Sequence, residues 1–222
     1  MFRYFQNALL IAALLLAMLC LPVFAQTGQK ETALDAKVKA FLDKMKYQWE
    51  DLNVPEADGQ LLFDLVLKNN FKKALELGTS TGHSGIWIAW ALSKTGGKLV
   101  TVEIDEGRHK QALANFKEAG LSDFVEAKLA DAHQLVEEIK GPFDFVFIDA
   151  DKEWYTNYAK ALIPKLEPGG CIAAHNVSER RGGYGGYGGG TGAYYEYIKS
   201  LPGFETSMAA ARSSLAVSYK KK

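Results

Sequence analysis

A glycine-rich turn between an apolar strand and an apolar helix constrains the fold of this chain more than any other stretch. Residues 74–85 read ALELGTSTGHSG, in which a strand closes near Glu76 and is followed by Gly78, Gly82 and Gly85. Glycines in such a turn let the chain bend sharply and allow a ligand to approach the backbone. Three residues separate the first two glycines, whereas a dinucleotide-binding turn has one residue there. The stretch predicts a cradle for a nucleotide cofactor, and by itself it also fits an ordinary junction between a strand and a helix.

Apolar strand-like runs alternate with helical patterns along the rest of the chain. Such alternation predicts an α/β fold with right-handed crossovers and a parallel sheet. Helices are expected at residues 32–49, 56–69, 86–92, 108–119, 135–139, 155–166 and 193–201. Further strands are expected at residues 98–105, 124–129, 143–148 and 171–174, with a terminal antiparallel hairpin at 204–208 and 214–219. The continuous apolar run at 143–148 is typical of a central parallel strand buried on both faces.

Polar side chains gather just past the C-terminal ends of the expected parallel strands. Open α/β sheets bind ligands at this edge, so these side chains are expected to converge on one cleft. The convergence indicates a functional site more strongly than any single motif does. The side chains belong to residues 76–82, Glu103, residues 131–133, residues 149–152, His175 and Asn176.

The composition is that of an ordinary globular chain and argues against nucleic acid as a partner. The 222 residues are 48% hydrophobic and 23% charged, which fits one domain. The 26 basic residues balance 26 acidic ones, so no surplus of positive charge is available to neutralise phosphates. Cys171 lies in an apolar run and is expected to be a buried strand residue.

Residues 1–25 have the pattern of a secretory signal peptide. Arg3 precedes a long apolar run, and residues 23–25, VFA, provide a cleavage site. Cleavage would leave a domain at residues 26–222 that is secreted or periplasmic. The apolar run is also just long enough to span a bilayer, and an uncleaved segment would anchor the domain to a membrane.

Residues 180–192, RRGGYGGYGGGTG, form a low-complexity segment of glycine and tyrosine. Regular structure here would cost a large amount of backbone entropy, so a mobile loop beside the cleft is expected. The segment is interpreted either as a tolerated insertion or as a lid. In the second case Tyr184 or Tyr187 would close over an aromatic substrate.

Several blocks, in order, make the chain similar to the S-adenosylmethionine (SAM)-dependent O-methyltransferases of the catechol and caffeoyl-CoA type. The blocks are NVPEADGQLL, LELGTSTGHSGIWIA, VTVEIDEGRHKQALANFKEAGL, FDFVFIDADKEWYTNY, LEPGG and LAVSYKKK. The resemblance implies a Rossmann-like class I methyltransferase fold of the α/β class. Its seven-stranded, mostly parallel sheet would have an antiparallel last strand and helices on both faces.

The resemblance also implies which residues bind SAM. The glycine turn would lie against the methionine part, and Glu103 would accept both ribose hydroxyls. Ala132 and His133 would flank the adenine, and Val54 would sit near the sulfonium. The implied cofactor-binding residues are Val54, Glu76, Gly78, Ser84, Glu103, Ala132, His133 and Asp149.

In that family a divalent ion holds a vicinal diol, and a phenolate oxygen attacks the methyl carbon in an in-line displacement while a lysine serves as base. By position, Asp149 would be the first metal ligand and Lys152 the base. The fifth strand departs from the family pattern, because His175-Asn176 stands where Asp-Asn is usual. The loss of one carboxylate disfavours magnesium or calcium, and a histidine suits zinc, manganese or iron better.

Three outcomes of this departure remain open. Asp149, His175 and Asn176 could hold a different metal, His175 could serve as the base of a metal-free methyltransferase, or the domain could bind SAM without transfer. The predicted function is methyl transfer to the hydroxyl of a small phenolic or catechol-like acceptor. The alternative is an exported or anchored SAM-binding domain without activity. A small aromatic acceptor is the expected partner, a membrane is involved only if residues 1–25 are uncleaved, and the resemblance suggests a homodimer.

Overall fold

The computed structural model describes residues 31–49, 52–177, 190–209 and 214–222. The chain divides at Thr32 into two units, and the fold described here is that of Ala33–Lys222. The predicted signal peptide or anchor at residues 1–25 lies outside the described residues, as does most of the predicted loop with both of its tyrosines. None of the helices in the described ranges is long and apolar enough to cross a membrane.

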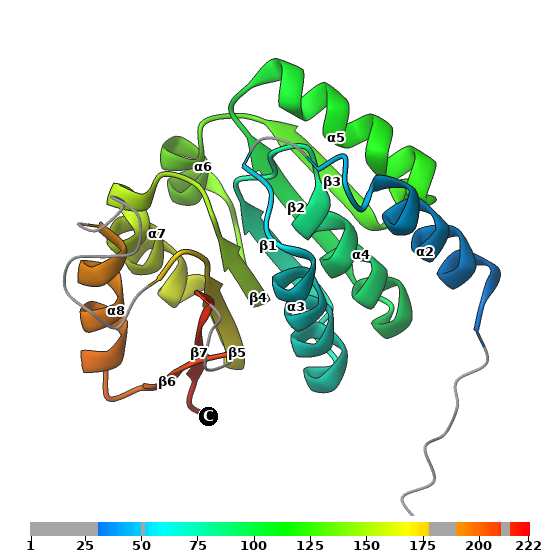
Figure 1. Ribbon diagram of the computed structural model, residues 1–222. Helices are drawn as coiled ribbons and strands as arrows, with labels where there is room; N and C mark the ends of the chain where they lie inside the picture. The colour runs from blue at the N-terminus through cyan, green and yellow to red at the C-terminus, as the bar shows by residue number, and fades with distance from the viewer. Residues whose placement is uncertain (1–30, 50–51, 178–189, 210–213) are drawn as a thin grey trace, which may run out of the picture. The chain divides into compact units, whose positions relative to one another are not determined.

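A seven-stranded sheet runs through this unit in the order β3-β2-β1-β4-β5-β7-β6 (Figure 1). Strands β1 to β5 pair in parallel, and β7 is antiparallel to both of its neighbours, β5 and β6. The predicted α/β fold with a mostly parallel sheet and a terminal antiparallel hairpin is therefore confirmed. The strands are β1 (Lys73–Leu77), β2 (Lys98–Glu103), β3 (Val125–Leu129), β4 (Phe143–Ile148), β5 (Leu166–Ala174), β6 (Phe204–Met208) and β7 (Ala216–Lys220).

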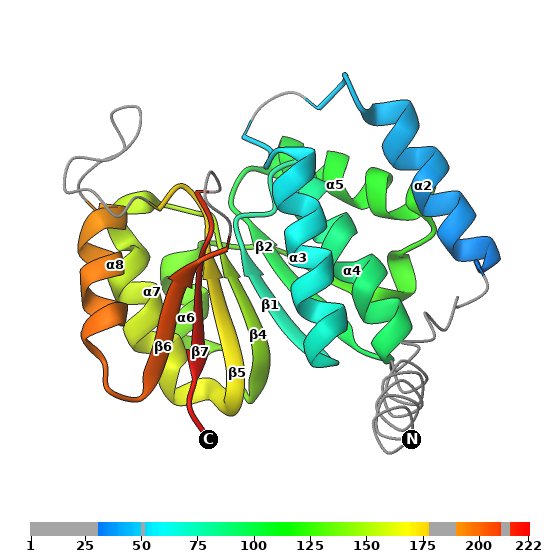
Figure 2. The ribbon, with the colours of Figure 1, turned by 60° about the horizontal axis from the view of Figure 1, so that its bottom comes forward.

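Helices cover both faces of the sheet, and each face has its own hydrophobic core (Figure 2). One face carries α2 (Ala33–Met45), α3 (Glu56–Asn69), α4 (His83–Thr95) and α5 (Glu106–Ala119), and the other carries α6 (Ala132–Glu138), α7 (Tyr155–Leu162) and α8 (Gly190–Ser200). Phe145 and Phe147 of β4 pack into the first core, and Val146 and Ile148 pack into the second. Successive strand residues point to opposite faces, which explains why β4 reads as one continuous apolar run.

The predicted glycine turn connects β1 to α4 and requires glycine where elements pack closely. Gly78 has a φ of +93°, and a Cβ on it would lie 2.8 Å from the carbonyl oxygen of Asp149. A Cβ on Gly85 would lie 2.9 Å from the Phe116 ring and 3.0 Å from the Glu76 carboxylate. Side chains at these positions would push the turn away from β4 and α4 away from α5.

The fifth strand starts earlier than the sequence suggests. It begins at Leu166 and not at Cys171, so the Pro-Gly-Gly segment at 168–170 lies within β5 and not in a turn before it. The pairing of β5 with β4 has an irregularity between Phe143 and Phe145. Irregular pairing of this kind accommodates proline and glycine inside a strand, which is why these residues do not end it.

The predicted glycine loop ends earlier than expected, because Gly190 opens α8 and residues 190–192 form its first turn. A Cβ on Gly190 would lie 2.1 Å from the carbonyl oxygen of Lys152. Glycine therefore allows α8 to pack against the backbone that follows β4. Two helices are shorter than predicted: α2 ends at Met45 and α7 ends at Leu162.

Candidate active site

A pocket of about 320 Å³ lies at the carboxyl ends of β1, β2, β3 and β4. The predicted convergence of strand ends on one cleft therefore holds for these strands. Five of the residues predicted to bind a cofactor line the pocket: Gly78, Glu103, Ala132, His133 and Asp149. Other lining residues, which the sequence did not single out, include Leu52, Ile104, Arg108 and Tyr158.

Glu103 ends β2 with its carboxylate fixed by the backbone. Its Oε2 accepts the N–H of Ser80 at 2.7 Å, and its Oε1 accepts those of Ile104 and Asp105 at 3.1 and 3.0 Å. Oε2 accepts only one of these bonds and has a second lone pair, so the side chain keeps acceptor capacity toward the pocket. The arrangement suits a ligand that offers hydroxyl donors.

Glu76 is fully buried in β1, below the glycine turn. Its Oε2 accepts from the Thr101 hydroxyl at 2.6 Å, while its Oε1 has no hydrogen-bond partner among the described residues. Burial raises the pKa of Glu76 to about 7, although hydrogen bonds from Ser84 and Thr101 act in the opposite direction. Ser80 Oγ is another buried atom without a partner in the described ranges. Unpaired buried polar atoms are costly, and a polar ligand at the turn would satisfy them.

His133 lies at the pocket wall and stacks on Trp154, with ring centroids 4.0 Å apart. Its Nε2 lies 3.2 Å from Oδ2 of Asp151. Its backbone N–H donates to Asp131 at 2.8 Å, a contact that caps α6. The start of α6 and the turn after β4 thus hold this ring in place.

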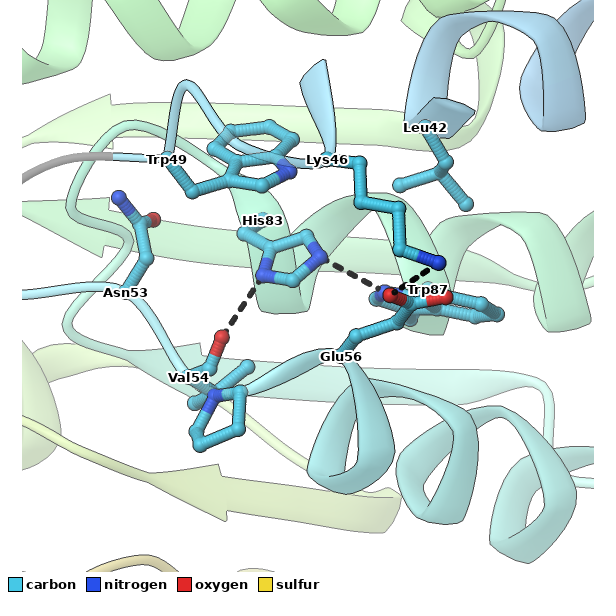
Figure 3. Close-up of a pocket in the computed structure, with 9 residues that line it drawn as sticks. Leu42, Lys46, Trp49, Asn53, Val54, Glu56, His83 and Trp87 are labelled. Atoms are coloured by element: carbon cyan, nitrogen blue, oxygen red, sulfur yellow. Dashed lines mark hydrogen bonds and ion pairs between the residues drawn. The ribbon is translucent and has the colours of Figure 1, made fainter. Parts of the chain in front are cut away.

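Val54 does not line this pocket but a second one of about 250 Å³, beside the start of α3 (Figure 3). Its carbonyl accepts Nδ1–H of His83 at 2.8 Å, and the indole N–H of Trp87 donates to Nε2 of the same ring at 3.0 Å. Both ring nitrogens of His83 are used, and burial lowers its pKa, so the ring is neutral. We assign His83 a structural role.

Asp149, Lys152 and Tyr155 form a polar cluster at the carboxyl end of β4. Lys152 Nζ forms an ion pair with Oδ1 of Asp149 and donates to the Tyr155 hydroxyl at 3.0 Å. That hydroxyl lies 3.4 Å from the same Asp149 oxygen. Burial and the nearby Asp149 raise the pKa of Tyr155 well above its usual value, so the phenol stays protonated. Lys152 therefore returns to the cleft beside Asp149, as its spacing predicts.

His175 follows β5 and bridges two carboxylates. Its Nε2 lies 3.1 Å from Oδ2 of Asp58, and its Nδ1 lies 3.3 Å from Oδ2 of Asp149. The second contact is an ion pair without the alignment of a hydrogen bond. Burial lowers the pKa of His175, but the contacts with Asp149 and Asp58 outweigh it and raise the pKa to about 9. A ring nitrogen that faces a carboxylate carries its proton, so both nitrogens are donors.

This arrangement does not fit the divalent metal that the resemblance implies. A ligating nitrogen needs a free lone pair, and both ring nitrogens of His175 face carboxylates. The two oxygens of Asp149 are already paired with Lys152 and His175. Across the described ranges, no group of three or more His, Cys, Asp or Glu side chains is arranged to hold a metal ion. Asn176, the third predicted ligand, directly follows His175 in a left-handed backbone conformation, with a φ of +54°.

Sequence reasoning missed Asp58, which is buried in the first turn of α3. It lies 117 residues from His175 along the chain, so no local pattern connects the two. One signal in the sequence pointed to this pair. The aspartate usual in the family is replaced by His175, and an acid stands near the start of the helix that precedes β1. An acid that is absent from one element and present on another is consistent with an ion pair between the two elements.

The profile of the O-methyltransferase family matches residues 27–180, and the chain belongs to this family. A solved O-methyltransferase from Bacillus cereus, in complex with SAH, is 29% identical to this chain. The two structures superpose with a TM-score of 0.67, over 85% of this chain and 91% of the other.

Curated relatives carry the names that the sequence resemblance suggested. A catechol O-methyltransferase from Niastella koreensis is 42% identical over 130 residues, which are 57% of this chain and 58% of the relative. Caffeoyl-CoA O-methyltransferase 2 from Petunia hybrida is 34% identical over 138 residues, which are 60% of this chain and 57% of the relative. The match thus spans less than two thirds of each relative, and it confirms the resemblance to this type.

Proposed function

We propose that the chain transfers the methyl group of SAM to the hydroxyl of a small phenolic acceptor. Family membership and the SAH complex of the Bacillus cereus relative support the cofactor. The observation that carries the proposal is the position of Asp149, which lines the larger pocket and also pairs with Lys152. One residue thereby joins a pocket of cofactor size to a polar cluster suited to an acidic hydroxyl.

The residues of the larger pocket fit the groups that SAM presents. When bound, SAM supplies a methyl group on a positively charged sulfur. Glu103 is placed to accept hydroxyl donors of the ribose, since the backbone fixes its carboxylate. Ser80 lines the pocket, and its Oγ, which has no partner among the described residues, suits the polar amino-acid end. Ala132 and His133 form a wall against which the base would lie.

We assign Lys152 the role of contacting the hydroxyl oxygen of the acceptor. In its ion pair with Asp149 it is an ammonium, which has no lone pair to accept a proton. We therefore assign it stabilisation of the acceptor as a phenolate, with the hydroxyl proton released to solvent. The oxygen then bonds to the methyl carbon as the carbon–sulfur bond breaks, and the electron pair of that bond stays on sulfur.

Calorimetry with SAM, followed by mass spectrometry of products from a panel of phenols, tests the proposal. We expect saturable binding of SAM and a product heavier by one methylene. Asp149→Asn is expected to weaken both. Absence of SAM binding would overturn the whole proposal, and binding without product across the panel would overturn the transfer step. The comparisons give no support to the alternative of a domain that binds SAM without transfer.

We also propose that residues 1–25 are a signal peptide whose removal sends the domain out of the cytoplasm, with an uncleaved membrane anchor as the alternative. The sequence pattern of this segment supports the proposal. Intact-mass measurement of the native protein distinguishes an N-terminus at Gln26 from one at Met1. The homodimer that the resemblance suggests is checked on the same sample by light scattering.

A further inference from the structure

We propose that the bridge of Asp58, His175 and Asp149 takes the place of a divalent metal, so that transfer needs neither a metal nor a vicinal diol in the acceptor. The part about the acceptor rests on the proposed function. The part about the metal concerns this chain alone and can be tested without any activity.

The bridge is built from side chains that are almost completely removed from solvent. The side chain of His175 is 7% exposed, that of Asp58 is 10% exposed and that of Asp149 is 9% exposed. Buried carboxylates need a partner that compensates their lost hydration. The imidazole ring of His175 is one such partner for both carboxylates. His175 follows β5, and through it the first turn of α3 is linked to the end of β4.

A metal on Asp149 would have to displace contacts that already satisfy this residue. One of its oxygens pairs with Lys152 and the other faces Nδ1 of His175. Removing His175 from the bridge would also leave Asp58 without the ring that lies 3.1 Å away. Breaking a buried pair by removing one partner is strongly unfavourable. The position is therefore filled by the chain itself.

The class of acceptor that the site would take follows from the groups beside Asp149. A metal binds both oxygens of a diol at once. Here Lys152 Nζ and the Tyr155 hydroxyl lie only 3.0 Å apart and together form a single polar contact site. A single hydroxyl of the acceptor is enough to contact both groups. The acceptor class is accordingly a phenol with one free hydroxyl, and a neighbouring hydroxyl adds little.

Metal binding is the first test and uses the full chain after treatment with a chelator. Calorimetry with Mn²⁺ and with Zn²⁺ is expected to show no saturable binding to the wild type. His175→Asp, which restores the Asp-Asn ending usual in the family, is expected to bind Mn²⁺. The matched control His175→Asn removes the ring without adding a carboxylate and is expected to bind neither ion. Saturable binding by the wild type that is lost in both Asp149→Asn and His175→Asn would overturn the bridge.

Acceptor choice is the second test. The rate of methylation of catechol is compared with that of a phenol of matched ring and a single hydroxyl, with and without the chelator. A site built around a second substrate hydroxyl rejects an analogue that lacks it by about 10⁴-fold. Here the two acceptors are expected to differ by no more than about tenfold, with no effect of the chelator. A preference for catechol of about a thousandfold, lost on chelation, would overturn the inference. Absence of transfer to both would contradict the proposed function, and the metal titration would still decide the bridge.

Discussion

The carboxylate of Glu103 accepts the backbone N–H of Ser80 at 2.7 Å and thereby ties the end of β2 to the glycine turn after β1. The same carboxylate accepts two further backbone N–H groups, from Ile104 and Asp105. Its orientation is therefore set before any ligand arrives, which reduces the entropy that binding must overcome. Glu103 therefore holds the glycine turn in place and also presents a hydrogen-bond acceptor at the wall of the pocket.

Glu103→Gln is expected to weaken SAM binding by about tenfold or more, because a hydrogen bond to a charged group contributes about 1.5–3 kcal/mol. The amide also places an NH₂ donor against backbone N–H groups that now donate to the carboxylate. Calorimetry measures the change. Glu106→Gln, at an exposed position in the first turn of α5, is the control and should bind SAM like the wild type. Equal affinity in the two variants would remove Glu103 from the cofactor site.

Substitutions of Lys152 separate charge stabilisation from base catalysis. Arginine keeps the positive charge but cannot be deprotonated in a protein, whereas methionine keeps the apolar stem without charge. We expect Lys152→Arg to retain measurable turnover and Lys152→Met to lose about 10²-fold or more, the usual scale for removal of one stabilising donor. Initial rates at saturating SAM give the comparison. Loss of turnover in both variants would restore the base role that the resemblance implies.

Glu76 should make the stability of the SAM-free protein depend on pH. Its pKa is raised from 4.5 to about 7 in the folded chain. Between these values the folded state holds a proton that the unfolded state has lost, so the free energy of unfolding falls as pH rises. The contribution is complete below pH 4.5 and is lost as pH rises through about 7.

Urea unfolding at about pH 5 and about pH 8 measures this effect. Glu76→Gln cannot ionise, so its stability should fall less than that of the wild type between the two conditions. Glu126→Gln, at an exposed position of β3, serves as the control and should keep the wild-type dependence. The same pH dependence in wild type and Glu76→Gln would contradict the shifted pKa.

Gly190 and Gly192 offer a matched pair within one turn of α8. A Cβ on Gly190 would lie 2.1 Å from the carbonyl oxygen of Lys152, whereas a Cβ on Gly192 would meet nothing within 4 Å. Gly190→Ala should therefore lower the melting temperature and, by moving the backbone of Lys152, the rate of transfer. Gly192→Ala should be neutral or stabilising by up to about 1 kcal/mol, the helix-propensity gain. Similar melting temperatures for the two variants would show that α8 does not pack on this backbone.

The sheet could be predicted because its signals are local. The predicted bounds of β4, Phe143–Ile148, agree with the structure. This strand is buried on both faces, and Asp144 is its one polar residue, so its ends are clear in the sequence. The start of β5 was placed too late because proline and glycine usually end a strand, and the irregular pairing with β4 that tolerates them involves residues far away in sequence. The start of α8 was missed for a similar reason, as Gly190 is selected by contact with Lys152.

The candidate site was predictable where it follows strand ends and unpredictable where it depends on a contact across the sheet. Gly78, Glu103 and Asp149 were found because each comes directly after or at the end of an apolar run. The partner of His175 was not found, because Asp58 lies on α3, which precedes β1, 117 residues away from His175 along the chain. Val54 was placed at the cofactor by resemblance alone, and the structure brings it to another pocket.

Asp58 also shows that the acceptor side of the cleft is not one continuous piece of the chain. Asp149, Lys152 and His175 come from residues 149–175, but Asp58, the partner of His175, belongs to α3, before β1. A chimera that took everything from β5 onward from a relative with aspartate at the position of His175 would set a second buried carboxylate against Asp58. Like charges in such a place repel strongly when no cation is bound between them. Recombination between relatives, in nature or in the laboratory, would have to exchange the start of α3 together with the end of β5.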